Sequence, residues 1–126
     1  MSAYGASKTA LIRFTETLAI ETQPYGVAVL AVGPGTVRTP LSDHVATSPQ
    51  VRARAPMVQQ WFQQLFEEGL DTPIEQAVEL VVALASGRAD ALSGCYLDVD
   101  DDLEELIEQA QAIRREPRLM LRLRTV

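Results

Sequence analysis

The stretch Gly26-Val27-Ala28-Val29-Leu30-Ala31-Val32-Gly33 decides the fold class of this chain. Every position between the two glycines is apolar, whereas a strand with one face in solvent would alternate apolar and polar residues. A short β-rich run of this kind indicates a strand that is buried on both faces. We therefore expect a parallel sheet with helices on either side, in which this strand has neighbours on both edges.

A loop rich in glycine and proline, Pro34–Thr39, follows this strand directly. In open α/β sheets ligands bind just beyond the carboxyl ends of the strands, so the loop lies where a binding site is expected. Glycine lets the backbone approach a ligand closely, and proline fixes the turn. A plain turn at the exit of a strand would explain the Pro-Gly pair equally well.

Upstream of the strand, the sequence predicts a helix from about Ala3 to Thr22, with an apolar side and a stop at Gln23–Gly26. Tyr4 and Lys8 lie four residues apart in this helix, which places them on the same face. A nearby cation favours the phenolate form of a tyrosine, whose usual pKa is near ~10. The pair is therefore a candidate acid-base site, but a solvated surface pair has the same spacing.

Downstream of the Pro34–Thr39 loop, the sequence predicts a second loop and then a helix. Leu41–Pro56 is polar and shows no clear period, which is typical of a lid or binding loop. His44, the only histidine, lies here without partners at ligand spacing, so we expect no metal-binding role for it. Met57–Glu68 predicts a helix whose aromatic side either lines a substrate pocket or packs against the body of the protein.

The carboxyl-terminal part begins with a capped helix. In Thr72-Pro73-Ile74-Glu75 a threonine cap, a proline at the first helical position and a glutamate at the third mark a helix start, and the helix continues to about Gly87. Ser93–Val99 predicts a second strand. Two strands separated by about 60 mostly helical residues imply a right-handed parallel crossover.

A dense acidic stretch follows this strand. Three of its residues match the first ligand positions of a calcium-binding loop: Asp98, Asp100 and Asp102. Leu103 then replaces the required glycine and Gln109 the bidentate glutamate, so we expect no metal site. The sequence instead predicts a final helix over Leu103–Arg115 that Pro117 ends, and an extended strap over residues 119–124.

Composition restricts the classes of function. The chain has 126 residues, the size of one domain, and 47% of them are hydrophobic. We expect no membrane association, because no run approaches the roughly 20 apolar residues that cross a bilayer. The net charge of −6 argues against binding nucleic acid. No secretory signal is evident, and the single cysteine, Cys95, fits a cytoplasmic protein.

Taken in order, these segments resemble the carboxyl-terminal half of a short-chain dehydrogenase/reductase, a family with a Rossmann-type fold. The resemblance covers nearly the whole chain, and three motifs carry it: Tyr4-Gly5-Ala6-Ser7-Lys8, Pro34-Gly35-Thr36-Val37-Arg38-Thr39 after the buried strand, and the strand after Ser93-Gly94. It implies an α/β fold, namely half of a doubly wound parallel sheet with about two parallel strands and four helices, incomplete as a domain.

The resemblance divides the partial domain, residues 1–126, into three parts. Residues 1–40 would contain the Tyr4 and Lys8 helix, the buried strand and a nicotinamide loop. Residues 41–70 would form the substrate loop and a lid helix, with Leu41–Phe66 binding a small-molecule substrate. Residues 71–126 would contain the capped helix, the last strand, the carboxyl-terminal helix and the tail.

The resemblance also implies a role for each matching residue. Tyr4 would exchange a proton with the substrate oxygen during hydride transfer between NAD or NADP and a secondary alcohol or ketone. Lys8 would assist Tyr4 and hold the nicotinamide ribose. Residues of the loop would cradle the nicotinamide amide and complete a cofactor-binding set of Tyr4, Lys8, Pro34, Gly35, Val37 and Thr39.

The chain departs from the family pattern in two ways. Asp100-Asp101 stands where many relatives carry a Gly-Gly pair. The glycine loop for phosphate and the catalytic serine of the family precede the tyrosine motif, and the seven glycines here form no Gly-x-x-x-Gly-x-Gly. We therefore expect an open edge on the Val27–Val32 strand, unpartnered inner faces on the first and last helices, and no activity from the chain alone.

Two hypotheses from different classes of function follow. In the first, the chain is a piece of a cytoplasmic oxidoreductase that needs a complementing amino-terminal half. In the second, it is a non-catalytic remnant that acts as an oligomerisation or interaction module, for example in a homo-oligomer. Loss of activity on Tyr4→Phe after reconstitution would favour the first hypothesis, whereas a clean folded monomer would exclude the second.

Overall fold

The computed structural model describes residues 2–116 and 118–122. The chain forms two compact units, which divide at Gly33/Pro34 and at Glu79/Leu80. The first unit contains the amino-terminal helix, both strands and the carboxyl-terminal elements, and the second is helical. This is a partial α/β domain, as the sequence predicted. No helix among the described residues combines the length and the apolar character that crossing a membrane requires.

Helix α1 spans Ser2–Thr22 and agrees with the predicted helix. A 3-10 turn, η1 (Gln23–Tyr25), follows it and ends at Gly26, whose φ of 69° is readily adopted by glycine. The buried positions of α1 are Thr15, Glu16 and Ala19. The most exposed apolar side chains of α1 are Leu11, Phe14 and Ile20. Leu11 and Phe14 are therefore exposed, as expected for an apolar side without partners, whereas Ala19 on the same predicted side is buried.

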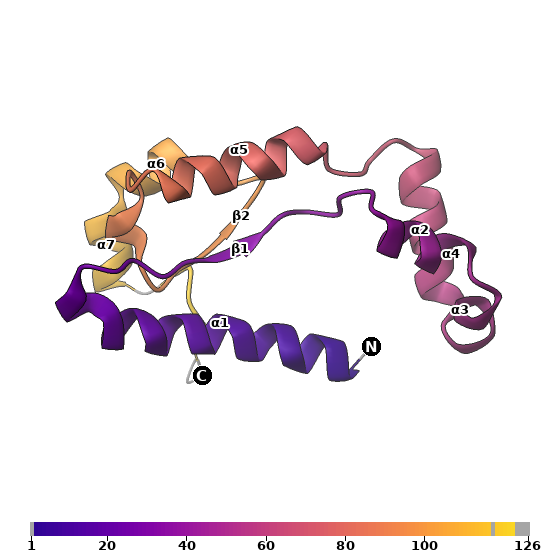
Figure 1. Cartoon of the computed structure of the whole chain (residues 1–126), viewed down its shortest axis with the longest axis horizontal. Coiled ribbons are helices and arrows are strands. Elements are labelled where there is room, and N and C mark those ends of the chain that lie inside the picture. Colours follow the sequence, from indigo (N-terminus) through magenta and orange to yellow (C-terminus); the bar gives the residue numbers. More distant parts are fainter. Residues whose placement is uncertain (1, 117, 123–126) are drawn as a thin grey trace. The chain divides into compact units, whose positions relative to one another are not determined.

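The two strands pair in parallel, as predicted. Strand β1 (Ala31–Gly33) lies beside β2 (Tyr96–Asp98), with Ala31, Val32 and Gly33 opposite Tyr96, Leu97 and Asp98. Figure 1 shows both arrows in the first unit, above α1. The prediction of a strand over Val27–Val32 buried on both faces was wrong. The strand is shorter than predicted, Val27 lies outside it and is half exposed, and β1 is paired on one edge among the described residues.

The core of the first unit forms around β2. Its buried residues come from helix α5 (Ile74–Ala85), 3-10 turn η2 (Asp90–Leu92), β2 and helix α7 (Ala110–Arg115). Leu92, Leu97, Ile113 and Cys95 are almost fully buried. The expectation that the last helix lacks partners was therefore wrong, because Ile113 lies inside this core.

The predicted single helix Leu103–Arg115 is two helices. Helix α6 (Leu103–Glu108) ends at Gln109, and α7 begins at Ala110. The Gln109 backbone N–H donates to the carbonyls of both Glu105 and Ile107, a tightened last turn that closes α6. The described residues of the two units together contain seven α-helices, where the sequence predicted about four.

The second unit corrects the prediction of a loop over Leu41–Pro56. It contains helix α2 (Pro40–Thr47), helix α3 (Pro49–Arg54) and helix α4 (Pro56–Glu67), the last of which was predicted. Each begins with a proline at the first helical position, where the missing N–H costs no hydrogen bond. Prolines therefore start three helices in this region, and Figure 1 shows α2, α3 and α4 gathered together.

The packing of α4 also differs from its sequence pattern. Gln59, on the predicted polar side, is buried, and its side-chain amide donates to the carbonyls of Val45 and Ser48 at 3.3 and 3.0 Å. Met57 and Trp61, on the aromatic side, are exposed. Because carbonyls near the end of α2 can accept a side-chain donor, an amide side chain fits there better than a hydrocarbon.

Candidate functional site

Tyr4 and Lys8 lie together on the first turns of α1. The Lys8 Nζ is 5.4 Å from the centroid of the Tyr4 ring, so the predicted stacking on one helix face is confirmed. Tyr4 is 61% exposed, and its hydroxyl makes no hydrogen bond to any residue that the structure describes. Both polar groups are therefore available to a ligand.

The Pro34–Thr39 loop is held by a residue far along the chain. Thr72 donates its backbone N–H to the Thr36 carbonyl and accepts the Thr36 N–H at its hydroxyl, both at 3.0 Å. Gly35 has a φ of 69°, and a Cβ at this position would overlap the Thr72 hydroxyl. Gly35 is therefore required both by the backbone conformation and by the close approach of Thr72.

The far end of the same loop caps helix α2. The Thr39 hydroxyl accepts the Ser42 N–H, and the Thr39 N–H donates to the Ser42 hydroxyl at 2.8 Å, which completes a capping box. The Ser42 hydroxyl also donates to the Val37 carbonyl at 3.2 Å. Thr39 and Val37, predicted as contacts for a nicotinamide amide, are thus ordered by Ser42.

Sequence reasoning missed Thr72 and Ser42 as residues that order this loop. Ser42 had a readable signal, because threonine, proline and serine at the cap, first and third helical positions form a capping pattern. Thr72 had none, since its partner Thr36 lies 36 positions away. Pro34 is exposed on the same loop. The structure thus groups the predicted site residues in two sets, Tyr4 with Lys8 in the first unit and the loop residues in the second.

Tyr96 is another tyrosine of the first unit, but its environment differs from that of Tyr4. Its hydroxyl donates to the Asp98 carboxylate at 2.7 Å, which together with burial raises the pKa of Tyr96 to about 12. Tyr96 therefore stays protonated at neutral pH and is not a candidate base. Asp101, in the place of the expected Gly-Gly pair, accepts the Asp98 N–H at 2.7 Å.

The two sets of residues offer different binding groups. An exposed phenol with a neighbouring ammonium can bind the hydroxyls of a ribose and of a substrate, and an ordered loop can bind an amide. The sequence offers no glycine-rich loop for a pyrophosphate. Within the described residues, no group of histidine, cysteine, aspartate and glutamate side chains could hold a metal ion.

Comparison with known proteins finds a family model and several curated relatives that match this chain. A family model described as Enoyl-(Acyl carrier protein) reductase matches residues 1–101. A short-chain dehydrogenase/reductase of Armillaria gallica is 32% identical over 99 residues, which cover 79% of this chain and 37% of that protein. Galactitol 2-dehydrogenase of Rhizobium johnstonii is 33% identical over 99 residues, with coverage of 79% and 36%.

A bacterial relative without a stated substrate gives the same picture. The oxidoreductase UcpA of Escherichia coli is 29% identical over 99 residues, which cover 79% of this chain and 37% of that protein. The chain thus spans little more than a third of the length of these curated relatives. No solved structure gave a significant match to the chain.

Proposed function

Because the chain belongs to the short-chain dehydrogenase/reductase family, an oxidoreductase family, we propose that it carries the nicotinamide and substrate half of an active site. The reaction is the interconversion of a secondary alcohol and a ketone with NAD or NADP. The exposed Tyr4 hydroxyl beside Lys8 is the observation that carries this proposal. The relatives named as dehydrogenases support the class of reaction.

Tyr4 acts on the substrate oxygen. Its hydroxyl has no competing partner among the described residues, so the phenol can donate a proton to a ketone oxygen, and in the reverse direction the phenolate can accept the proton of an alcohol. The ammonium of Lys8, 5.4 Å from the centroid of the Tyr4 ring, can bind ribose hydroxyls. The bound nicotinamide would supply or accept the hydride.

The Pro34–Thr39 loop supplies a second set of cofactor contacts. Thr72 orders its first half and Ser42 its second, so the backbone groups and the Thr39 hydroxyl are presented at little entropic cost on binding. Pro34, Gly35, Val37 and Thr39 would contact the carboxamide. Leu41–Phe66, which is helical, would contact the small-molecule substrate.

We expect these 126 residues alone to be inactive, because they contain no cradle for the pyrophosphate. Titration with NADH and NADPH, followed by Trp61 fluorescence and thermal shift, tests this. No response is expected at micromolar cofactor. A saturable response would show that the chain binds the cofactor without a complementing half.

Reconstitution tests the role of Tyr4. The chain would be co-expressed with the amino-terminal part of a relative, such as galactitol 2-dehydrogenase, that precedes its tyrosine motif. In an active pair, Tyr4→Phe should lower kcat by about 10²–10⁴-fold. Tyr25→Phe is the matched control, because Tyr25 is 82% exposed and outside the proposed site. Equal activity of both variants would contradict the proposal.

An interaction module is the second candidate, and the apolar surface of α1 favours it. Leu11, Phe14 and Ile20 are all more than half exposed, and β1 has one paired edge among the described residues. Such a module would form a homo-oligomer or join a complementing half. Sedimentation velocity tests this candidate, and a folded monomer at all concentrations would exclude self-association. The free, buried Cys95 supports a cytoplasmic location for either candidate.

A further inference from the structure

The first unit contains a cavity of about 430 Å³ that is separate from Tyr4 and Lys8. It lies between α1, the segment Gly26–Ala28, the turn at Ser93 and Gly94, and the described part of the tail. Its volume falls in the range of small-molecule sites, roughly 300–1,000 Å³. The proposed function leaves this cavity without a role.

Three guanidinium groups from three different elements line the cavity. Arg13 comes from α1, Arg114 from α7 and Arg122 from the tail. The Nε of Arg114 donates to the Ala91 carbonyl at 3.0 Å, which anchors its side chain at η2. A guanidinium has five donors in a planar fork, so the terminal amino groups of an anchored arginine can still bind an anion.

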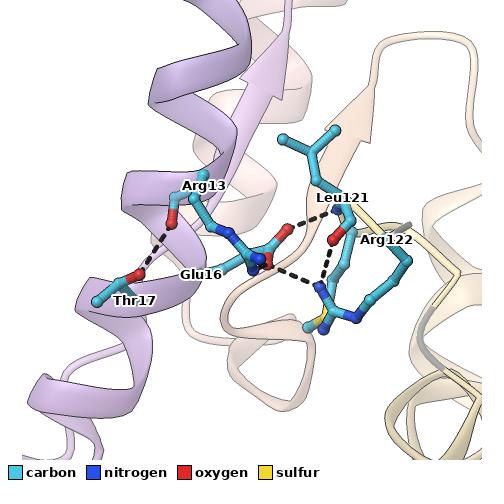
Figure 2. Close-up of polar contacts among 6 residues, drawn as sticks. Arg13, Glu16, Thr17, Leu121 and Arg122 are labelled. Carbon is cyan, nitrogen blue, oxygen red and sulfur yellow. Dashed lines mark hydrogen bonds and ion pairs between the residues drawn. The ribbon is translucent and has the colours of Figure 1, made fainter.

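A buried carboxylate holds the other two arginines in place. Figure 2 shows Glu16, which is 5% exposed, between Arg13 and Arg122. Its Oε2 accepts from Arg13 Nη1 at 2.6 Å and from Arg122 Nη1 at 2.8 Å. Its Oε1 accepts the backbone N–H of Leu121 at 2.6 Å. One side chain thus orients two guanidiniums at the wall of the cavity.

Glu16 remains ionised in this position. Burial alone raises the pKa of Glu16, but the hydrogen bond from the Leu121 N–H and the charges of Arg122 and Arg13 outweigh burial and leave the pKa below its usual value. Glu16 therefore carries the negative charge that pairs with the two arginines at neutral pH.

The cavity has an excess of positive charge. Its described lining contains three guanidiniums and two carboxylates, Glu16 and Asp90, whereas the whole chain has a net charge of −6. Arg13 and Arg122 share one carboxylate and are 63% and 41% exposed, so neither is fully neutralised or enclosed. A concave surface with this balance attracts a small anion.

The remaining lining is apolar. Ile20 and Val27 are 72% and 52% exposed, and Ala19 and Met120 contribute further hydrocarbon. Ligand sites commonly combine an apolar lining with a few polar groups that fix the orientation of the ligand. We propose that this cavity binds a small anion with a carboxylate or phosphate-ester head on the arginines and a short apolar body against Ile20 and Val27.

The test uses three probes that share a phenyl ring: benzoate, phenyl phosphate and the neutral benzamide, which matches benzoate in shape. Binding to the whole chain would be followed by NMR chemical shifts and calorimetry. At least one anion should bind saturably below about 10 mM, and benzamide should bind at least about tenfold more weakly. Raising the NaCl concentration should weaken the binding of the anion, because the arginine side chains are partly exposed and salt screens their charge. The stronger anion identifies the head group.

Variants assign the binding to the cavity. Arg114→Gln should weaken the binding of the anion at least about tenfold, since the substitution removes a charged donor and leaves the contacts of Glu16 in place. Ile20→Glu should do the same by adding a negative charge to the apolar wall. Arg88→Gln is the matched control, because Arg88 pairs with Glu104 and does not line the cavity. Circular dichroism checks that each variant is folded.

Three outcomes would overturn the proposal: neither anion binds up to about 10 mM, benzamide binds as well as benzoate, or folded Arg114→Gln and Ile20→Glu bind like Arg88→Gln. The proposal does not depend on the dehydrogenase function, because no probe is a cofactor and no readout is an activity.

Discussion

The two sets of predicted site residues, the Tyr4 and Lys8 pair and the Pro34–Thr39 loop, are held in different ways. The pair is positioned by its own helix, with a local hydrogen bond from the Ser7 hydroxyl to the Tyr4 carbonyl at 2.7 Å. The loop is positioned by Thr72, 36 residues from Thr36, and by the capping box of α2. The loop therefore has a defined geometry within its unit. The position of the pair, in contrast, depends on how firmly α1 itself is held.

This difference indicates where support for the pair comes from. Within α1 the buried residues begin at Thr15, and Glu16 links the helix to Leu121 and Arg122. Gly94, with a φ of 93°, approaches Ala19 on the same side. The chemical groups thus lie at one end of a helix whose anchoring lies further along. Substitutions in the loop, at the anchor and in the pair should therefore have graded effects on stability.

Gly35→Ala should have the largest effect. A left-handed φ costs a residue with a Cβ about 1–2 kcal/mol, and overlap with Thr72 adds about 1–3 kcal/mol. Gly69→Ala is the matched control, because Gly69 has a φ of 64° and open space around it. Urea unfolding followed by Trp61 fluorescence measures both. Equal losses would show that Thr72 does not restrict the loop.

Glu16→Ala should come next, with a loss of about 1–3 kcal/mol in the free energy of unfolding. The substitution leaves the Leu121 N–H without its acceptor and two guanidiniums without their carboxylate. The ion pairs themselves add little, because both arginines are exposed. Glu21→Ala, at an exposed position of the same helix, should change stability by less than about 0.5 kcal/mol. A similar loss in both variants would show that Glu16 stabilises the fold no more than an exposed glutamate of the same helix.

The contribution of Glu16 to the free energy of unfolding should decrease as the pH falls. Its pKa is lower in the folded chain than in the unfolded chain, so its contribution is complete above the usual carboxyl range and is lost as the pH falls through its folded pKa. The melting temperature of the wild type should therefore fall more steeply on acidification than that of Glu16→Gln. Parallel curves from pH 6 to about pH 3 would contradict this assignment.

Tyr4→Phe should have the smallest effect on stability, below about 0.5 kcal/mol, because the hydroxyl is exposed and makes no hydrogen bond to the described residues. Lys8→Met should behave alike, apart from a small loss of its contact with the Tyr4 ring. Thermal unfolding followed by circular dichroism measures both. A large loss in either variant would mean that the pair is structural, which would reverse the comparison with the loop.

Local sequence signals predicted several elements well. The periodicity of residues 3–22, the helix starting after Thr72-Pro73 and the parallel pairing of two apolar strands all agree with the structure. The error over Leu41–Pro56 came from a local signal with two meanings. Proline after threonine or serine starts α2 and α3 here, whereas the same residues also break helices.

The sequence by itself determined the family and the order of the elements, because tyrosine and lysine spacing, apolar runs and capping residues act over a few positions. Only the tertiary structure decided that Glu16 is buried against Leu121 and Arg122, that Thr72 holds the Gly35 loop, and that Gln59 lies inside. These contacts join residues that are distant in the sequence or contradict the pattern of their own helix. Their stability comes from satisfying buried polar groups, which no local pattern records.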